Sequence, residues 1–375
     1  MKKIAIIISH TPNPRILKRI KSLENDFIIS LIYWDRGQSI KRPFEINEKH
    51  KVTHITVNAA QGNMVARIIP LMKYLIKVLR LLITENPEII HAANMDMLFI
   101  ATTYRKIYNK KVKIIYEVAD LPNYSVIHRI NSIKSLTAVA LQWVEKRLTR
   151  GISKLILTSP YFWEVYFSKF ISKDKYMFIP NTPSRTLFSK YIKKEHERFT
   201  VGFIGSVRYV RELKMLIDAA GEVSIDIEVF IAGIGPGYQE IYEYCRDKKY
   251  VKIYGPYNYE KDIVYLYEEI DCTYSVYNAQ LENVKIALPN RLYESIVCEI
   301  PIIASKDTML GEFIVSKQIG TTIAFDDKEE LKKQIYELAT SKKKLRFYQE
   351  NCKRIKHDYY YEKNSQLLLN EYKIL

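Results

Sequence analysis

Short apolar runs rich in β-branched residues alternate with longer amphipathic segments along the chain. In the first half, the runs that we predict to be strands lie at 3–9, 27–34, 52–58, 88–93, 112–119, 154–159 and 176–181. The segments that we predict to be helices lie between them, at 14–24, 70–84, 95–108, 128–150 and 160–170. Continuous apolar strands separated by helices are typical of a parallel sheet covered on both faces. The pattern therefore predicts an α/β fold.

The same rhythm restarts in the second half, after a polar and charged stretch. Its predicted strands lie at 199–206, 225–233, 251–256, 271–277 and 321–326, and its predicted helices at 210–220, 238–247, 258–268, 327–339 and 342–373. A chain of 375 residues is longer than one hydrophobic core usually supports. We therefore predict a first domain over 1–183, a linker over 184–198, a second domain over 199–355 and a final helix over 356–375. Ligands of such sheets bind outside the carboxyl ends of the strands, in the cleft that two units leave between them.

The net charge of +16 and the isoelectric point near 9.3 predict an anionic partner, such as nucleic acid, a phospholipid surface or a phosphate-bearing substrate. The sequence holds no recognisable nucleic-acid-binding module, so we expect no nucleic acid partner. Four cysteines without Cys-x-x-Cys spacing suggest neither a zinc site nor disulfides. No apolar run approaches the ~18 residues of a membrane span, and the N-terminal apolar run is too short for a signal peptide. We expect a cytoplasmic protein, soluble or peripheral at the inner face of the cell membrane.

The segment "VGFIGSVRYVRELKMLIDAA" (201–220) places a Gly-Ser turn between a strand and a helix. This geometry presents free backbone N–H groups and the positive end of a helix to an anion. Arg208 and Arg211 lie in or beside the turn, and two guanidinium groups suit the oxygens of a diphosphate. Taken alone, both arginines are also compatible with solvated surface charges. The turn "AGIGPG" (232–237) adds only weak evidence, since turns need glycine in any case.

The segment "LPNRLYESIVCEIPIIAS" (288–305) places one carboxylate near the start of a helix that leads into a buried strand. Pro289 and Asn290 suit a helix start, with Asn290 as the cap or Pro289 as the first residue. Glu294 then lies in the early turns, where the helix dipole favours an acid. That dipole alone is one explanation of Glu294. The other is that its carboxylate accepts hydrogen bonds from two sugar hydroxyls.

The last segment resembles the donor-site helix of GT-B glycosyltransferases, especially glycosyltransferase family 4 within the group 1 glycosyl transferases. The segments that share the resemblance are 13–23, 86–98, 112–122, 202–220, 230–237 and 359–375, so it covers essentially the whole chain. It implies two Rossmann-like parallel-sheet domains that face a cleft, the second of which binds the nucleotide-sugar. It also implies that the last helix crosses back to pack on the first, acceptor-side domain.

The resemblance also implies site residues. For the donor diphosphate they are Ser206, Arg208, Arg211, Asn290 and Arg291. Glu294 resembles the ribose-binding acid, and Asp120 resembles the aspartate of a His-Asp pair near the transferring sugar, which makes it the catalytic candidate. The loop "SHTPNPR" offers His10, Asn13 and Arg15 as further cleft candidates.

Three positions and one loop depart from the family pattern. Ile286 stands where many members have a second glutamate, and Ala119 stands where the pair before Asp120 usually has its histidine. Glu299 replaces the glycine that often ends the donor-site helix, and the first loop lacks paired glycines. These changes bear on which donor sugar the protein uses and on whether it is fully competent in catalysis.

The function that the resemblance implies is sugar transfer, with retention of configuration, from a nucleoside diphosphate sugar, by expectation a UDP-sugar. The acceptor would be lipid-linked or polysaccharide, in capsule or cell-envelope glycan synthesis. No Asp-x-Asp pair follows a strand, and arginines with a helix end can stabilise the leaving diphosphate, so we expect neither a metal nor another cofactor. A sugar-nucleotide epimerase and a catalytically silent homologue that scaffolds polysaccharide assembly are the alternatives.

Two basic helices are compatible with a membrane contact. The segment "IIPLMKYLIKVLRLLI" (68–83) is apolar on most faces and carries Lys73, Lys77 and Arg80 as one stripe, and 128–150 is a basic, Trp-containing helix. An ordinary helix with its cations in water fits the stripe. Peripheral contact with anionic lipid headgroups fits it too, and suits an enzyme with a lipid-linked acceptor.

Overall fold

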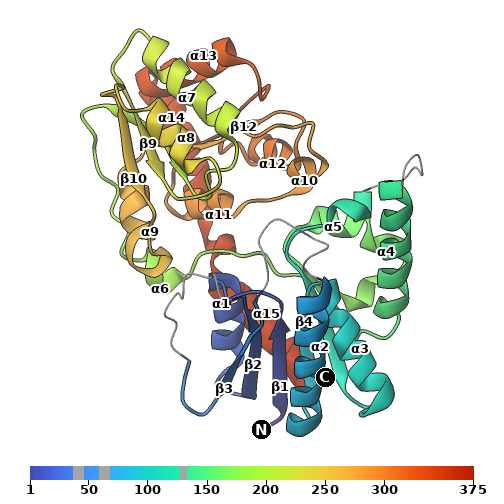
Figure 1. Ribbon diagram of the computed structural model, residues 1–375. Coiled ribbons are helices and arrows are strands. Elements are labelled where there is room, and N and C mark those ends of the chain that lie inside the picture. Colours follow the sequence, from blue (N-terminus) through green and yellow to red (C-terminus); the bar gives the residue numbers. More distant parts are fainter. Residues whose placement is uncertain (37–45, 59–67, 127–132) are drawn as a thin grey trace. The chain divides into compact units, whose positions relative to one another are not determined.

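A computed structural model describes residues 1–36, 46–58, 68–126 and 133–375 of the chain (Figure 1). The chain forms two compact units. The first consists of Met1–Pro180 together with Asn364–Leu375, and the second of Asn181–Lys363. Each unit is built on one sheet in which every strand pair is parallel. The prediction of two parallel-sheet units is confirmed.

The first sheet has seven strands in the order β3-β2-β1-β4-β5-β6-β7. The strands are β1 (Lys3–Ile8), β2 (Ile28–Asp35), β3 (Lys51–Thr56), β4 (Ile89–Ala93), β5 (Lys113–Val118), β6 (Lys154–Leu157) and β7 (Tyr176–Phe178). β1, β4 and β5 are buried along almost their entire length, as helices on both faces require. The strands predicted from the sequence begin and end within three residues of the observed strands.

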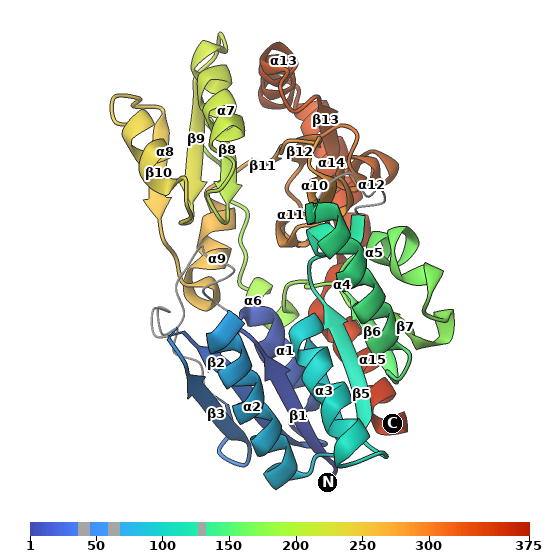
Figure 2. The same ribbon diagram turned by 45° about the vertical axis from the view of Figure 1, so that its right-hand side comes forward.

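Helices cover both faces of this sheet. They are α1 (Pro14–Leu23), α2 (Ile68–Glu85), α3 (Met95–Ile107), α4 (Ile133–Thr149), α5 (Pro160–Val165) and α15 (Tyr361–Ile374). Figure 2 shows α2, α3 and α4 on one face and α1 with α15 on the other. α1 begins where Asn13 accepts a hydrogen bond from the Ile16 N–H, with Pro14 as the first helical residue. Residues 127–132 of the predicted helix 128–150 lie outside the described residues.

The last helix returns to the first unit, as predicted. Leu368 and Tyr372 of α15 are fully buried in the apolar cluster that also contains Ile16 and Ile20 of α1. The continuous helix predicted over 342–373 is wrong, because a 3-10 turn at Lys356–Tyr359 separates α14 (Lys342–Ile355) from α15. The physical reason is packing: the Tyr359 ring stacks on Tyr293 of the second unit, so the chain turns inward before it crosses back.

The second sheet has six strands in the order β10-β9-β8-β11-β12-β13. The strands are β8 (Phe199–Ile204), β9 (Ile227–Ala232), β10 (Val251–Gly255), β11 (Cys272–Ser275), β12 (Ile302–Ser305) and β13 (Gly320–Ile323). The helices besides α14 are α6 (Arg185–Phe188), α7 (Val210–Glu222), α8 (Tyr238–Tyr244), α9 (Tyr259–Glu268), α10 (Glu282–Ile286), α11 (Asn290–Val297), α12 (Met309–Lys317) and α13 (Lys328–Thr340). The stretch 184–198, predicted as a linker, lies within this unit because α6 buries Phe188 against Tyr267 and its neighbours.

Each sheet has one point at which the strand order reverses. In the first unit this switch lies between β1 and β4, and in the second between β8 and β11. Ligands of open α/β sheets bind at such points, outside the carboxyl ends of the strands. The loops that follow these four strands are therefore where functional side chains are expected.

All four cysteines are buried in the second unit as free thiols. Across the described ranges, the helices are each too short or too polar to cross a bilayer.

Candidate functional site

The loop after β8 is locked to the loop after β9 by backbone contacts. Gly205 takes a φ of +144° and Gly233 a φ of +136°, and a Cβ atom at Gly233 would lie 1.7 Å from the Gly205 carbonyl oxygen. Val207 donates its N–H to the Ile234 carbonyl and accepts from the Gly237 N–H. Only glycine allows this approach, so the turn "AGIGPG" holds the phosphate-loop candidate in place.

The locked loop leads into the N-terminus of α7. Tyr209 is the N-cap residue and its side chain makes no capping hydrogen bond, so the N–H groups of the first turn have no partner within the helix. Arg208 is exposed and donates from Nε to Ser206 Oγ at 3.1 Å, and Arg211 is exposed in the first turn. Two cations and several N–H donors therefore border this loop, which suits an anion.

Arg291 reaches the same loop from α11. Its side chain is buried, with the guanidinium 4.2 Å above the Phe203 ring and Nη1 3.3 Å from the Tyr274 carbonyl oxygen. A Cβ atom at Gly205 would lie 2.4 Å from Nη2 of Arg291. The guanidinium thus covers Gly205 directly. Three of the five residues predicted for the diphosphate, Ser206, Arg208 and Arg291, lie around one turn.

Aromatic rings bridge the switch point of the second sheet. Tyr209 follows β8 and Tyr277 follows β11, and their ring centroids lie 4.8 Å apart. The Arg291 guanidinium is 5.4 Å from the Tyr277 ring. The basic loop therefore lies at the topological switch, where the fold rule places a ligand.

Glu294 of α11 is buried, and its carboxylate accepts hydrogen bonds from two tyrosine hydroxyls. The Tyr259 hydroxyl donates to Oε1 at 2.8 Å and the Tyr267 hydroxyl donates to Oε2 at 2.9 Å. Burial, followed by the neighbouring carboxylate, raises the pKa of both tyrosines well above the usual value. A carboxylate has about four lone-pair sites. Two of them are filled by the phenols, so two further donors can be accepted.

The other positions of the donor-site segment have ordinary surroundings. Pro289 is the N-cap of α11 and Asn290 is its exposed first residue, so the alternative in which Asn290 caps this helix is wrong. Ile286 is buried as an apolar residue. Glu299 adopts a left-handed φ of +57° and pairs with Lys356 at 2.7 Å.

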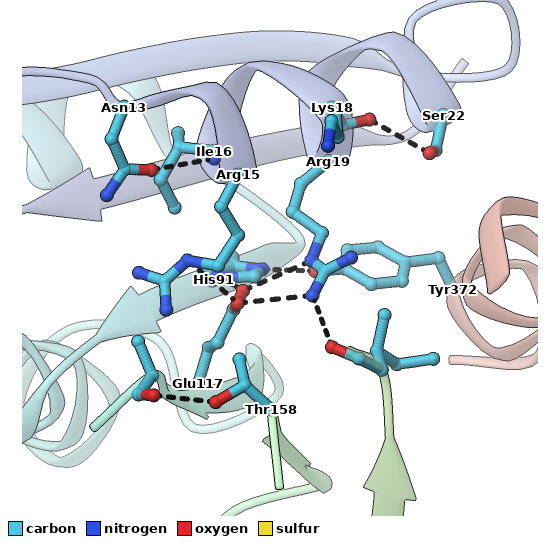
Figure 3. A network of polar contacts seen from close by, with 12 residues as sticks. Asn13, Arg15, Ile16, Lys18, Arg19, Ser22, His91, Glu117, Thr158 and Tyr372 are labelled. Atoms are coloured by element: carbon cyan, nitrogen blue, oxygen red, sulfur yellow. Dashed lines mark hydrogen bonds and ion pairs between the residues drawn. The ribbon is translucent and has the colours of Figure 1, made fainter. Parts of the chain in front are cut away.

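In the first unit, the candidate Arg15 belongs to a buried charge network (Figure 3). Glu117 of β5 is fully buried, and Arg15 Nε lies 3.4 Å and Arg19 Nη2 3.3 Å from its Oε1. His91 Nε2 lies 2.8 Å from Oε2, and the ring also hydrogen-bonds the Tyr372 hydroxyl of α15. The side chain of Arg15 therefore has a structural partner inside the unit.

Burial alone would raise the pKa of Glu117, but Arg19 and Arg15, with the hydrogen bond from His91, hold it well below the usual value of 4.5. The carboxylate thus stays ionised among its cations. Glu117 and His91 lie on strands of the sheet, whereas Arg15 and Arg19 lie on α1. The network therefore ties the helix to the sheet. It could not be predicted, since no local pattern links these positions.

The remaining first-unit candidates lie near the switch between β1 and β4. His10 follows β1, and its Nδ1 lies 2.7 Å from the Thr11 carbonyl oxygen. Burial lowers the pKa of His10 and raises the pKa of Asp96, which begins α3 after β4. Asp120 is exposed, two residues after the end of β5. Asn13 serves as the cap of α1.

Sequence reasoning missed several residues of these sites. Tyr259, Tyr267 and Tyr277 carry no motif, and in a chain with 29 tyrosines no single one stands out. Asp96 stands alone in "NMDML", and only the position after β4 marks it. In the described ranges, no group of three or more His, Cys, Asp or Glu side chains is arranged to hold a metal ion.

Comparison with known proteins bears on this site directly. The family model described as "Glycosyl transferases group 1" matches residues 184–355, which contain the whole second-unit site. The similarity to this family therefore lies within the second unit. The resemblance to group 1 glycosyl transferases is thereby confirmed, while the narrower assignment to family 4 stays a prediction.

The chain also resembles a curated protein and several solved structures. The chain is 27% identical over 263 residues to the succinoglycan biosynthesis protein ExoL of Rhizobium meliloti (strain 1021), a match that spans 66% of this chain and 63% of that protein. Sucrose-phosphate synthase from Thermosynechococcus elongatus has the same fold, with a TM-score of 0.77 at 15% identity over 100% of this chain and 98% of that chain. Anabaena HepE, in structures with UDP and with UDP-glucose, has a TM-score of 0.70 at 16% identity over 100% of both chains. The predicted GT-B architecture of two Rossmann-like units is confirmed.

The Glu117 network gives a pH-dependent prediction. Replacing Glu117 by glutamine leaves two buried arginines without their anion, which should lower the free energy of unfolding at neutral pH by about 3–5 kcal/mol. Because the folded pKa is depressed, the contribution of Glu117 is present above its unfolded pKa and is lost as the pH falls through the folded value. The stability difference between wild type and Glu117→Gln should therefore shrink below about pH 4.5. Tryptophan fluorescence during denaturation measures it, since Trp34, Trp143 and Trp163 all lie in the first unit.

Glu145→Gln is the matched comparison in the same unit. Glu145 accepts hydrogen bonds from Tyr116, Tyr124 and Tyr166, and burial raises its pKa. Ionisation of Glu145 therefore costs stability as the pH rises above the unfolded value. The pH dependence should run opposite to that of Glu117→Gln, and the same slope in both variants would contradict the network's role.

Proposed function

We propose that this protein transfers a sugar from a nucleoside diphosphate sugar, by preference a UDP-sugar, to a polysaccharide or lipid-linked acceptor. The similarity to group 1 glycosyl transferases supports the reaction class. The structures of a protein with the same fold in complex with UDP and UDP-glucose support the donor. The similarity to a succinoglycan biosynthesis protein supports a role in polysaccharide synthesis, in the capsule or cell envelope.

One observation carries the proposal, namely the position of Arg291 over Gly205 beside the open N-terminus of α7. Departure of the sugar leaves negative charge on the diphosphate. Fixed donors aimed at developing charge are usually the largest single contribution to catalysis. Arg208, Arg291 and the first-turn N–H groups would stabilise this charge, so the proposed reaction needs no divalent cation.

The acceptor hydroxyl would attack the face of the sugar from which the diphosphate departs, and a phosphate oxygen would take its proton. The bond between the anomeric carbon and the phosphate oxygen breaks as the new glycosidic bond forms. This sequence retains the configuration, as the family resemblance implies. Asp120 and His10, which follow β5 and β1, are the first-unit side chains proposed to face the sugar and its acceptor.

Alanine substitutions test the phosphate assignment. Arg208→Ala and Arg211→Ala should each raise the Kd for UDP at least tenfold, because a charged hydrogen bond contributes about 1.5–3 kcal/mol. Calorimetry with UDP measures the change. Lys214→Ala is the control, since Lys214 lies on the same helix but pairs with Glu240 at 2.8 Å.

Unchanged UDP affinity in both arginine variants would refute the assignment. Product analysis of wild type with UDP-sugars separates the remaining alternatives. An epimerase converts the donor without an acceptor, and a silent scaffold leaves it intact, whereas a transferase slowly hydrolyses it to UDP and free sugar.

The two free acceptor positions of Glu294 predict recognition of the ribose diol. Wild type should bind UDP at least about fivefold more tightly than 2′-deoxy-UDP, because the deoxy analogue leaves a buried acceptor unpaired, which costs about 1–3 kcal/mol. Tyr267→Phe releases one carboxylate oxygen from its phenol. That variant should bind UDP less tightly while the preference for UDP over 2′-deoxy-UDP falls severalfold. Paired calorimetric titrations with the two nucleotides measure both numbers.

Tyr265→Phe is the control on the same helix, because the Tyr265 side chain is 41% exposed. Its preference for UDP should equal that of wild type. If Tyr267→Phe also kept the wild-type preference, then Glu294 would not contact the ribose.

We also propose that α2 rests on an anionic membrane. Its exposed face combines the apolar side chains Ile69, Met72 and Ile76, which are 68%, 49% and 49% exposed, with the exposed cations Lys73 and Lys77. Residues spaced three and four apart lie on one side of a helix. An exposed apolar stripe flanked by cations fits the boundary between lipid headgroups and acyl chains.

Charge reversal tests the membrane contact. The double substitution Lys73→Glu/Lys77→Glu should reduce co-sedimentation with phosphatidylglycerol vesicles at least tenfold, because each cation near an anionic surface contributes about 1 kcal/mol. Lys342→Glu/Lys343→Glu on α14 changes the net charge equally and should bind the vesicles as wild type does. Equal binding by both variants would contradict the proposal.

A further inference from the structure

A second basic region lies at the opposite, amino-terminal edge of the first sheet. A cavity of about 510 Å³ opens there, between the end of α3 and the starts of β5 and β6. It is lined by Arg105, Lys110, Lys111, Val112, Lys113 and Ser153. Four of these six residues are cationic and none is acidic.

The three lysines of this cavity have unpaired side chains. Lys110, Lys111 and Lys113 form no side-chain ion pair or hydrogen bond within the described part of the chain. Three other lysines of the first unit, Lys51, Lys154 and Lys373, each pair with a carboxylate within 3 Å. Their charges are therefore free to act on a ligand.

The end of α3 explains only part of this charge. Cations are favoured near a helix C-terminus, and Arg105 and Lys106 occupy the last turn of α3. The Arg105 guanidinium already has a partner, because it donates a hydrogen bond to the Gly151 carbonyl. Burial lowers the pKa of this arginine. The lysines lie beyond the helix, so the dipole does not account for them.

The turn that carries the lysines is held in place. Asn109 accepts from the Lys111 N–H at 3.0 Å and donates to Asn86 at 3.2 Å, and Val112 is buried beneath the turn. On the far wall, Ser153 Oγ accepts from the Ile114 N–H at 3.3 Å, which leaves its hydroxyl hydrogen available. A fixed turn reduces the ordering that a ligand must impose.

We propose that this cavity binds a phosphate or diphosphate group with at least two negative charges. Three free ammonium groups and one hydroxyl donor surround it, and charge-assisted hydrogen bonds to phosphate are the strong ones. The cavity is of the size that holds small ligands. The same chemistry is offered by a soluble phosphate ester and by the phosphorylated headgroup of a lipid. The site lies in the first unit, at the amino-terminal edge of the sheet, so it is independent of the diphosphate site proposed in the second unit.

Inorganic pyrophosphate is the probe for the site. In calorimetric titrations at low ionic strength, the triple variant Lys110→Glu/Lys111→Glu/Lys113→Glu should bind one pyrophosphate fewer than wild type, and the glutamine triple variant should bind that equivalent at least tenfold more weakly. The control Lys342→Glu/Lys343→Glu/Lys353→Glu alters exposed lysines of α14 by the same charge and should behave as wild type. Stoichiometry and affinity equal to those of the control would overturn the proposal.

The same variants keep the two proposals apart. If the cavity is the site, then the pocket variant keeps wild-type UDP affinity in the second unit while it loses pyrophosphate. If UDP binds nowhere, the proposed function fails, but the pyrophosphate loss still stands.

Vesicles identify the source of the phosphate. With a lipid headgroup as the ligand, the pocket variant should sediment less than the α14 control with vesicles that contain phosphatidic acid, whose phosphomonoester can carry two negative charges, and pyrophosphate should release the wild-type protein. With a soluble phosphate as the ligand, both variants should sediment equally while the pyrophosphate loss remains.

Discussion

The close approach of two loop backbones in the second unit is the constraint on which its site depends. Gly233 lies so near the Gly205 carbonyl that no side chain fits between them, and both residues have φ values that side-chain-bearing residues avoid. This contact fixes the turn after β8, and that turn sets where α7 begins. The guanidinium of Arg291 can then rest over Gly205 only because that residue also lacks a Cβ atom. The basic site is therefore a consequence of backbone packing at the switch of the sheet.

The chain holds buried carboxylates in two different ways. Glu117 is surrounded by arginines and keeps a depressed pKa, which gives a permanent anion that ties α1 to the sheet. The carboxylates of Glu145 and Glu294 accept hydrogen bonds from tyrosine hydroxyls instead. Phenols orient a carboxylate without neutralising its charge. Glu145 uses three phenols and is closed off, whereas Glu294 uses two and retains acceptor capacity for a ligand.

Local pattern was sufficient to predict the two sheets and the basic turn that carries Arg208 between β8 and α7, because apolar periodicity and a turn between a strand and a helix are properties of neighbouring residues. The crossing of α15 and the roles of Ser206 and Arg291 came from the family resemblance. The tyrosines around Glu294 and the network of Glu117 join positions that are far apart in sequence, and no periodicity links them. The helix break at Lys356 was missed for a related reason, because the burial of Tyr359 depends on a partner, Tyr293, that lies 66 positions earlier.

The departures from the family pattern differ in physical meaning. Glu299 replaces a glycine, yet it keeps the left-handed backbone that glycine would adopt, with the side chain paired to Lys356. A left-handed conformation costs a side-chain-bearing residue about 1–2 kcal/mol, and the partly exposed ion pair offsets only part of that cost. The substitution therefore affects stability, while the backbone keeps a conformation that glycine also adopts. Ile286 is different, because a buried apolar side chain replaces an acid and no hydrogen-bond acceptor remains in its place. If the donor sugar binds near Ile286, as the family resemblance implies, other groups must hold it, so an altered donor preference should trace to Ile286 rather than to Glu299.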